Sequence, residues 1–476
     1  MSLNGKAFWR VERATRMSVL IDADSYFKNA RLAMLKARRR IMLIGWDFDA
    51  RIALTDSKRE EGEPAKVGDF IYWLVERNPD LEIFLLRWDV GALKTLTRGS
   101  TIFTLARWMR HPRIHTKLDS AHPVGASHHQ KIVVIDDCLA FCGGIDMTSG
   151  RWDTRRHRDV EPRRAAPSGK PYMPWHDATT ALQGPVAAAL GELARDRWQR
   201  AGGHALPPVA ETTDCWPKGL ATAFRQVEVG IARTSPELPD YPEVREIEAL
   251  FLEQIASAKV SIYAESQYFA SRRIAEAIAA RLAEADGPEI VIVNPEHAQG
   301  WLEPIAMDTA RARLVAALKQ RDVHDRFRLY HPYTAKGVAI YVHAKVMIVD
   351  GRTLRIGSAN MNNRSMGLDT ECDITIDAGD EGAEAIRAIR DGLIAEHLGL
   401  PAARVAAQID AQGSLIAAIE ALRGPGRSLR PYEVPDLNAV EGWLADNEVL
   451  DPESPSEMFE ATAKRGLFRR LRHPFG

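Results

Sequence analysis

The sequence predicts an α/β protein composed of two related α-β-α sandwich lobes. Three observations support this class. A length of 476 residues is sufficient for two domains with substantial cores. Helix-like and strand-like apolar patterns alternate along the chain, as they do in α/β folds. The same order of elements also occurs twice, and each time it leads to the short pattern His-x-Lys-x4-Asp.

Each half begins with a helix followed by a strand. In the first half, apolar residues recur at helical spacing over residues 24–37, and a strand-like run follows at 41–46. In the second half, Pro242 opens a helix with one apolar face, and a strand follows at 260–264. The His-x-Lys pattern comes about 85 residues after the start of this strand in both halves.

The domain boundary is expected at a stretch rich in glycine and proline, residues 202–208. We therefore predict a first lobe over residues 1–205, a linker over 206–222 and a second lobe over 223–400. Residues 401–476 form a predicted extension that is first helical and then rich in proline, with a basic tail.

Charge and cysteine content limit the possible functions. A formal net charge of −1 provides no overall basic field, so nucleic acid is not an expected partner. Four cysteines are too few for a disulfide framework in a chain of this size. Cys138 and Cys142 lie near histidines, but no second Cys/His pair has the spacing of a zinc site. We interpret them as small buried residues.

The sequence contains neither the apolar run of a signal peptide nor a charge-free apolar stretch of about 18 residues. We expect a cytoplasmic or peripheral membrane protein, and export without a cleaved signal is compatible with the same sequence. The tail at 464–472, in which basic residues alternate with Leu and Phe, is either a frayed end or a segment that rests on an acidic membrane.

The repeated motif is the most informative feature. Its members are His129, Lys131 and Asp136 in the first half, and His343, Lys345 and Asp350 in the second. The β-branched runs 132–135 and 346–349 indicate buried strands. Residues two apart on a strand share a face, so each histidine lies beside its lysine. Each aspartate is an odd number of positions from its histidine and should point away, as a brace for the local structure.

Small residues follow each motif at matching positions. Gly143 and Gly144 occupy them in the first half, and Gly357 and Ser358 in the second. Residues of this size allow backbone N–H groups and a short hydroxyl to approach a phosphate. Asn360 in the second half is matched by Asp146 in the first. A carboxylate would repel phosphate, so we expect Asp146 to bind an arginine, a lysine or backbone N–H groups.

These residues resemble those of the phospholipase D superfamily, whose members carry two such motifs or carry one and dimerise. The resemblance extends to about residue 400, and its flanking signatures are similar to the eukaryotic-type branch. They comprise the segments 143–148, 151–154, 174–177, 184–185, 265–269 and 360–366. The resemblance implies two lobes related by a pseudo-twofold axis with one active site between them. Because both motifs are on one chain, it also implies a monomer.

The resemblance further implies a mechanism. His129 is the expected nucleophile, which forms a covalent phosphohistidine, and His343 is the expected general acid and base. Lys131 and Lys345 neutralise the phosphate oxygens, while Asn360, Ser358 and Gly144 are expected to bind them. No metal and no cofactor are required in this scheme.

Family enzymes orient each histidine with an acidic residue. For His343 we expect Glu371, with Asp369 as the competitor. For His129 we expect Asp153, and two other acids, Asp159 and Glu161, remain open.

The expected activity is that of a phospholipase D at a membrane surface, which hydrolyses the distal phosphodiester of glycerophospholipids and also transfers the phosphatidyl group to alcohols. A cardiolipin or phosphatidylserine synthase is the first alternative, and a nuclease of the same superfamily is a less favoured one. The segment Trp175-His176-Asp177 is either part of the head-group side of the cleft or a structural cluster at a strand end. The basic run 155–158 is either a solvated loop or an attractant for anionic lipid.

Overall fold

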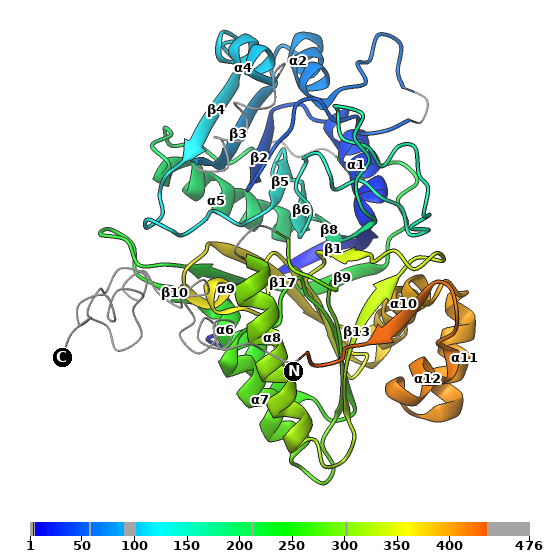
Figure 1. Ribbon diagram of the computed structural model, residues 1–476. Coiled ribbons are helices and arrows are strands. Elements are labelled where there is room, and N and C mark those ends of the chain that lie inside the picture. The colour runs from blue at the N-terminus through cyan, green and yellow to red at the C-terminus, as the bar shows by residue number, and fades with distance from the viewer. Residues whose placement is uncertain are drawn as a thin grey trace, which may run out of the picture.

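The computed structural model describes Leu3 and residues 5–56, 59–89, 101–210, 214–299 and 303–435. Figure 1 shows two halves, one above the other, which meet at the long strands β1 (Arg10–Ile21) and β9 (Phe224–Ser235). These strands pair antiparallel from Arg10↔Ile231 to Met17↔Phe224. The α/β class is confirmed. The two halves are nevertheless joined in one continuous sheet of sixteen strands among the described residues, because β1 and β9 are hydrogen-bonded to each other.

The strand order is the same in both halves when it is followed outward from this central pair. From β1 the order is β8, β6, β5, β2, β3 and β4, with bounds Ala178–Gln183, Leu139–Gly143, Ile132–Ile135, Arg40–Gly45, Glu82–Trp88 and Ile114–Asp119. From β9 the order is β17, β16, β15, β11, β12 and β13, with bounds Glu371–Asp377, Thr353–Gly357, Val346–Val349, Ser261–Glu265, Glu289–Val293 and Phe327–Tyr333. This repetition is the topology of an internal duplication.

Helices cover both faces of the sheet. One face packs on α5 (Pro185–Arg200) in the first half and on α10 (Gly379–Leu398) in the second, within one continuous apolar core. The opposite face has a separate core in each half. The helices of these two cores are α1 (Asp22–Met34), α2 (Val67–Arg77) and α4 (Thr101–Met109), then α6 (Glu246–Ser257), α7 (Arg272–Leu282) and α8 (Glu303–Arg321). A short helix, α9 (Asn363–Gly367), follows β16.

The alternation predicted for the motif strands is present. In β5, Ile132 and Val134 belong to the core under α5, whereas Val133 and Ile135 belong to the core under α1 and α2. Burial on both faces explains why these strands are continuous apolar runs. The residues that precede β5 and β15 are thereby fixed at equivalent edges of the two halves.

A second, two-stranded sheet links the halves directly. It pairs β7 (Trp175–His176) of the first half with β14 (Tyr341–Val342) of the second, in parallel. Both strands are buried, and the motif residue His343 follows β14 immediately. The link therefore places a segment of the first half beside the second motif.

Two differences from the sequence prediction concern the second half. Pro242 does not open a helix, because Val244–Arg245 forms β10 against β9, and α6 begins only at Glu246. The predicted extension contains α11 (Ala402–Gln412), α12 (Leu415–Leu422) and β18 (Ser428–Pro431), which adds an edge strand to β13.

The basic tail at 464–472 lies outside the described residues. Within the described part of the chain, the helices are too short or too polar to cross a bilayer.

Candidate active site

His129 is held by a residue of the other half of the chain. It lies three residues before the start of β5, and its Nδ1 lies 3.0 and 2.9 Å from the two carboxylate oxygens of Glu371 at the start of β17. The backbone supports this contact, because the His129 N–H donates to the Thr370 carbonyl and the Thr370 N–H donates to the Ser127 carbonyl. Since Nδ1 is engaged by the carboxylate, Nε2 is the ring nitrogen left for chemistry.

His343 is held in the reciprocal way. Its Nδ1 lies 2.7 Å from Oδ2 of Asp177, which follows β7 in the first half. Its backbone N–H donates to the His176 carbonyl at 2.8 Å, which continues the pairing of β7 with β14. Each motif histidine is therefore oriented by a carboxylate from the opposite half, and each leaves Nε2 available.

This arrangement corrects two predictions. Glu371 does orient a histidine, but it orients His129 and not the histidine of its own half. Asp153, expected at His129, instead accepts hydrogen bonds from His157, Arg164 and the Trp175 N–H. Asp177 was not predicted as an orienting acid, although the Trp-His-Asp segment that contains it was among the flanking signatures.

The acids that competed for these roles also lie elsewhere. Asp369 accepts from the Ser127 N–H at 2.7 Å and pairs with Arg364, so it supports the backbone before His129. Asp159 accepts from the Thr334 hydroxyl and the Lys336 N–H. Among the described contacts, neither of these two aspartates forms a hydrogen bond with His129 or His343.

The two lysines lie beside their histidines, on buried side chains. Lys131 Nζ donates to the His129 carbonyl at 2.8 Å, and Lys345 Nζ donates to the His343 carbonyl. Burial lowers the pKa of Lys345 to about 7, an effect that Asp177 opposes and Lys131 reinforces. Two ammonium groups that destabilise each other form a site that an anion would stabilise.

The histidine rings are in the form that a nucleophile requires. Burial, together with Lys131 and Lys345, lowers the pKa of His129 well below its usual value. Burial and the same lysines, with Arg151, lower the pKa of His343 in the same direction. A neutral imidazole whose Nδ1–H donates to a carboxylate has its lone pair on Nε2.

Burial also affects the orienting acid of His129. It raises the pKa of Glu371 to about 8, although the hydroxyls of Ser358 and Ser365 both donate to this carboxylate and oppose the shift. Glu371 is thus held by two hydroxyls in addition to His129, so its orientation does not depend on His129 alone.

Two of the three predicted phosphate contacts are corrected. The Ser358 hydroxyl donates to Glu371, so it supports the carboxylate behind His129. The Gly144 N–H donates to the Ala178 carbonyl at 2.9 Å, and a Cβ at this position would collide with the Asp177 carboxylate. Glycine is needed there for the approach of Asp177. Asn360 is buried, and its side-chain Oδ1 makes no hydrogen bond within the described chain.

Asp146 and the two motif aspartates bind backbone N–H groups or lysine. Asp146 accepts from the Trp46 and Asp47 N–H groups, and its other oxygen lies 3.3 Å from Lys131 Nζ. Asp136 accepts from the N–H groups of residues 38–40, and Asp350 from those of residues 259–261. Asp136, after β5, thus binds the backbone at the start of the neighbouring strand β2. Asp350, after β15, binds the backbone at the start of β11 in the same way.

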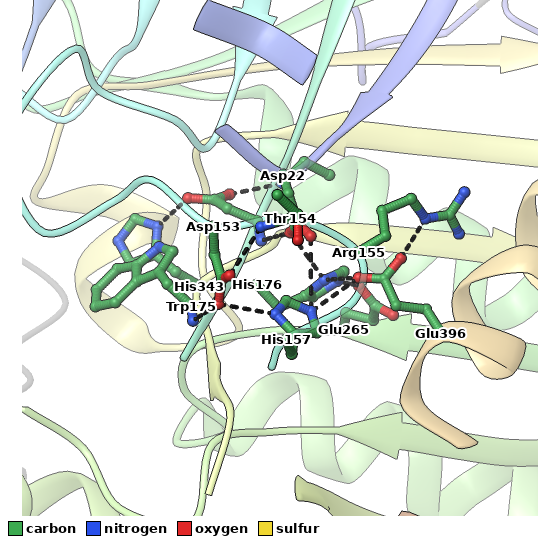
Figure 2. A network of polar contacts seen from close by, with 12 residues as sticks. Asp22, Asp153, Thr154, Arg155, His157, Trp175, His176, Glu265, His343 and Glu396 are labelled. Carbon is green, nitrogen blue, oxygen red and sulfur yellow. Dashed lines mark hydrogen bonds and ion pairs between the residues drawn. The ribbon is translucent and has the colours of Figure 1, made fainter. Parts of the chain in front are cut away.

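The wall beside His343 is aromatic. The Trp175 ring stacks on Tyr341 with centroids 4.6 Å apart and lies 5.2 Å from the His343 ring. The guanidinium of Arg151 lies over the Trp175 ring, 4.1 Å from its centroid. Behind the wall, His176 and His157 belong to a buried network of carboxylates (Figure 2). Cys138 and Cys142 are buried free thiols.

Two family models match this chain. A family model described as "Phospholipase D" matches residues 33–215, and one described as "Cardiolipin synthase, PLD-like domain" matches residues 251–391. The two matches cover the first and the second motif, respectively.

Curated relatives and a solved structure support the same family. A phospholipase D alpha 1 from Nicotiana tabacum is 23% identical over 77% of this chain and 63% of its own length. A phospholipase D A from Dictyostelium discoideum is 24% identical over 74% of this chain and 32% of its own length. The chain thus spans less than two thirds of the length of these relatives.

Among solved structures, a phosphatidylserine synthase from Haemophilus influenzae matches with a TM-score of 0.55 at 13% identity, over 80% of this chain and 88% of that one. At this identity the likeness concerns the fold. With one family match over each motif and a common fold, the chain belongs to the phospholipase D superfamily.

Proposed function

We propose that this chain is a phospholipase D that hydrolyses the distal phosphodiester of glycerophospholipids to phosphatidic acid and a free alcohol. The observation that carries the proposal is the reciprocal pairing of His129 with Glu371 and of His343 with Asp177. The pairing leaves Nε2 of each imidazole available, and two buried lysines lie beside the rings. These are the functional groups that a double displacement at phosphorus requires when no metal binds the phosphate.

In the first step, Nε2 of His129 attacks phosphorus, and the bond between phosphorus and the leaving alcohol breaks. Nε2–H of His343 gives its proton to the departing oxygen. This requires a proton on His343, whose pKa is depressed without substrate. A bound phosphodiester brings negative charge between Lys131 and Lys345, which raises the proton affinity of both rings.

In the second step, neutral His343 accepts a proton from water, and the water oxygen displaces His129 from phosphorus. An alcohol can replace water here, so transphosphatidylation accompanies hydrolysis. Asn360 lies buried near Ser365 and is the remaining candidate for a phosphate contact from the second half. Both motifs are on one chain, so we expect a monomer to be active on phospholipid at a membrane surface.

A phosphatidyltransferase of the cardiolipin or phosphatidylserine synthase type is the second candidate. It would use the same covalent intermediate with a lipid alcohol or serine as acceptor. The family match over residues 251–391 and the fold likeness to a phosphatidylserine synthase favour keeping this candidate. The two functions differ in the second alcohol, which we expect to contact residues beside the motifs, such as Trp175 and Arg151.

The test is an incubation with phosphatidylcholine vesicles and a primary alcohol, without added metal, beside labelled single-stranded DNA and beside vesicles with serine or phosphatidylglycerol as acceptor. We expect phosphatidic acid and phosphatidylalcohol, both lost in His129→Ala and in His343→Ala and kept in the exposed control His297→Ala. Transfer to serine or lipid alcohol with little hydrolysis would favour the synthase. Cleaved DNA with intact lipid would refute both lipid functions.

A further inference from the structure

A buried cluster of two histidines and two carboxylates lies behind the active-site wall, between the halves (Figure 2). Asp22 follows β1 at the start of α1, His157 lies in the loop after β6, and His176 belongs to β7. Glu396 comes from α10 of the second half. The exposed fractions of these side chains are 1% or less, so substrate cannot reach them.

The possible ligand atoms of the four residues lie within 4.8 Å of one another. Oε1 of Glu396 lies 3.0 Å from His157 Nε2 and 2.8 Å from His176 Nδ1. Asp22 places one oxygen 3.2 Å from His176 Nδ1 and the other 3.6 Å from His157 Nε2. In a tetrahedral zinc site with nitrogen and oxygen ligands about 2.0 Å from the metal, the ligand atoms are about 3.3 Å apart. The four measured separations fall on both sides of that value.

We propose that Asp22, His157, His176 and Glu396 bind one divalent transition-metal cation of the Zn²⁺ class, which ties the two halves together beside the active site. Two imidazoles and two carboxylates form a donor set that such cations prefer over Ca²⁺ or Mg²⁺.

The outer surroundings of both histidines fit this assignment. The second ring nitrogen of His157 lies 3.0 Å from Asp153, and that of His176 lies 2.8 Å from Glu265. A metal-bound histidine usually donates its other ring N–H to such a carboxylate, which fixes the tautomer and the ring orientation. Asp153 and Glu265 are themselves held, by the Trp175 N–H and by the Tyr263 hydroxyl.

Asp22 provides an independent observation. Its Oδ2 is buried and makes no hydrogen bond within the described chain; its contact there is the ion pair with His157 Nε2 at 3.6 Å, while its Oδ1 accepts from the Asp177 N–H at 3.1 Å. Asp22 also adopts φ +62°, a conformation that costs energy for a residue with a side chain. A buried carboxylate oxygen without a donor is expensive unless a cation is its partner.

The competing account is a set of ion pairs in which both rings carry an extra proton. Burial by itself lowers the pKa of His157, but Asp22, Asp153 and Glu396 raise it to about 9. Replacing two ring protons by one divalent cation leaves the charge of the cluster unchanged. The two accounts therefore differ in metal content, and in the protons that metal binding would release.

The cation would act through structure and not on the phosphate. The His176 carbonyl accepts from the His343 N–H, and the Asp177 N–H donates to Asp22. A cation on Asp22 and His176 would therefore stabilise the segment that presents Asp177 to His343. Glu396 would connect the same cation to α10 in the second half.

The test uses the full chain, treated with a chelator, dialysed and then titrated with Zn²⁺. We expect one equivalent of bound zinc per chain by elemental analysis, release of protons on binding, and a higher Tm than that of the metal-free chain. Asp22→Asn, which tolerates the positive φ, should weaken zinc binding by about 100-fold or more. Asp24→Asn, with an exposed carboxylate on the same helix, should bind zinc like the wild type.

The wild type alone also gives a decisive reading, should Asp22→Asn not fold. Co²⁺ bound by two imidazoles and two carboxylates in tetrahedral geometry has intense visible absorption, which octahedral surface-bound Co²⁺ lacks. Bands that appear at one equivalent and disappear on addition of Zn²⁺ would support the site. A wild-type chain that binds neither ion stoichiometrically, with Tm unchanged by Zn²⁺ and by chelator, would show that the cluster is a protonated ion-pair network and would overturn the proposal.

Discussion

Glu371 holds the ring of His129 from the other half of the chain, with both carboxylate oxygens within 3.0 Å of Nδ1. The two residues are 242 positions apart. Because Ser358 and Ser365 hold the same carboxylate, the second half positions the group that orients the first-half histidine. Neither half can present an oriented histidine without the other, so a complete site requires the docked pair of halves.

The first prediction concerns this contact. Both Glu371 oxygens face Nδ1. Glu371→Gln keeps the shape but replaces one of these oxygens with an amide nitrogen that cannot accept from Nδ1–H, so kcat should fall about 10- to 100-fold with little change in KM. Steady-state hydrolysis of vesicle-bound substrate measures both constants. Glu276→Gln, an exposed glutamate on α7, should leave both unchanged. A rise in KM at unchanged kcat would contradict an orienting role.

A second prediction separates the roles of the two histidines. His343→Asn lacks the base that activates water, so a single turnover with a good leaving group should leave acid-labile phosphatidyl label on His129. His129→Asn should form no such adduct, and both variants should lose at least about 100-fold in kcat. Peptide mapping of the quenched protein locates the label. Label on His343 in the His129→Asn variant would reverse the assignment.

The pH dependence of kcat/KM should report Lys345. Its ammonium form, with a pKa lowered to about 7, is lost as the pH rises through 7 in the free protein, so kcat/KM should decline above that pH. Lys345→Arg remains charged at all accessible pH values and should move this decline upward, at a lower maximum rate. An unshifted profile in the arginine variant would assign the decline to another group.

The same pKa shift has a consequence for stability. Lys345 has a pKa of about 7 in the folded chain, against a usual value of 10.5. The unfolded chain therefore binds the proton more tightly, and folding stability attributable to this residue falls as the pH drops from 10.5 towards 7. Lys345→Met should flatten the pH dependence of the free energy of unfolding across this interval.

A further prediction concerns Asp136, which accepts three backbone N–H groups and adopts φ +47°. Asp136→Ala leaves buried donors without an acceptor and puts alanine in a left-handed conformation, so the free energy of unfolding should fall by about 3 kcal/mol. Urea denaturation measures it. Asp325→Ala is the matched control, because Asp325 has φ +56° but an exposed side chain, and should cost only about 1 kcal/mol.

The motif strands could be predicted because their information is local. Strands buried on both faces must be apolar throughout, and β5 and β15 consist only of Ile, Val and Met. The central strands β1 and β9 escaped prediction for the opposite reason. They carry Arg10, Arg16 and Arg233, whose charges are neutralised by Glu192, Asp214 and Glu246 from elsewhere in the chain. Their segments therefore lack the continuous apolar run that marks β5 and β15.

The sequence by itself determined the α/β class, the duplication and the pairing of each histidine with a lysine two residues later, because side-chain alternation along a strand is a local property. Only the tertiary structure decided which carboxylate orients which histidine. Glu371 crosses to His129 and Asp177 crosses to His343, over 242 and 166 residues. These contacts follow from the packing of one half against the other through β1–β9 and β7–β14, and proximity along the chain does not specify that packing.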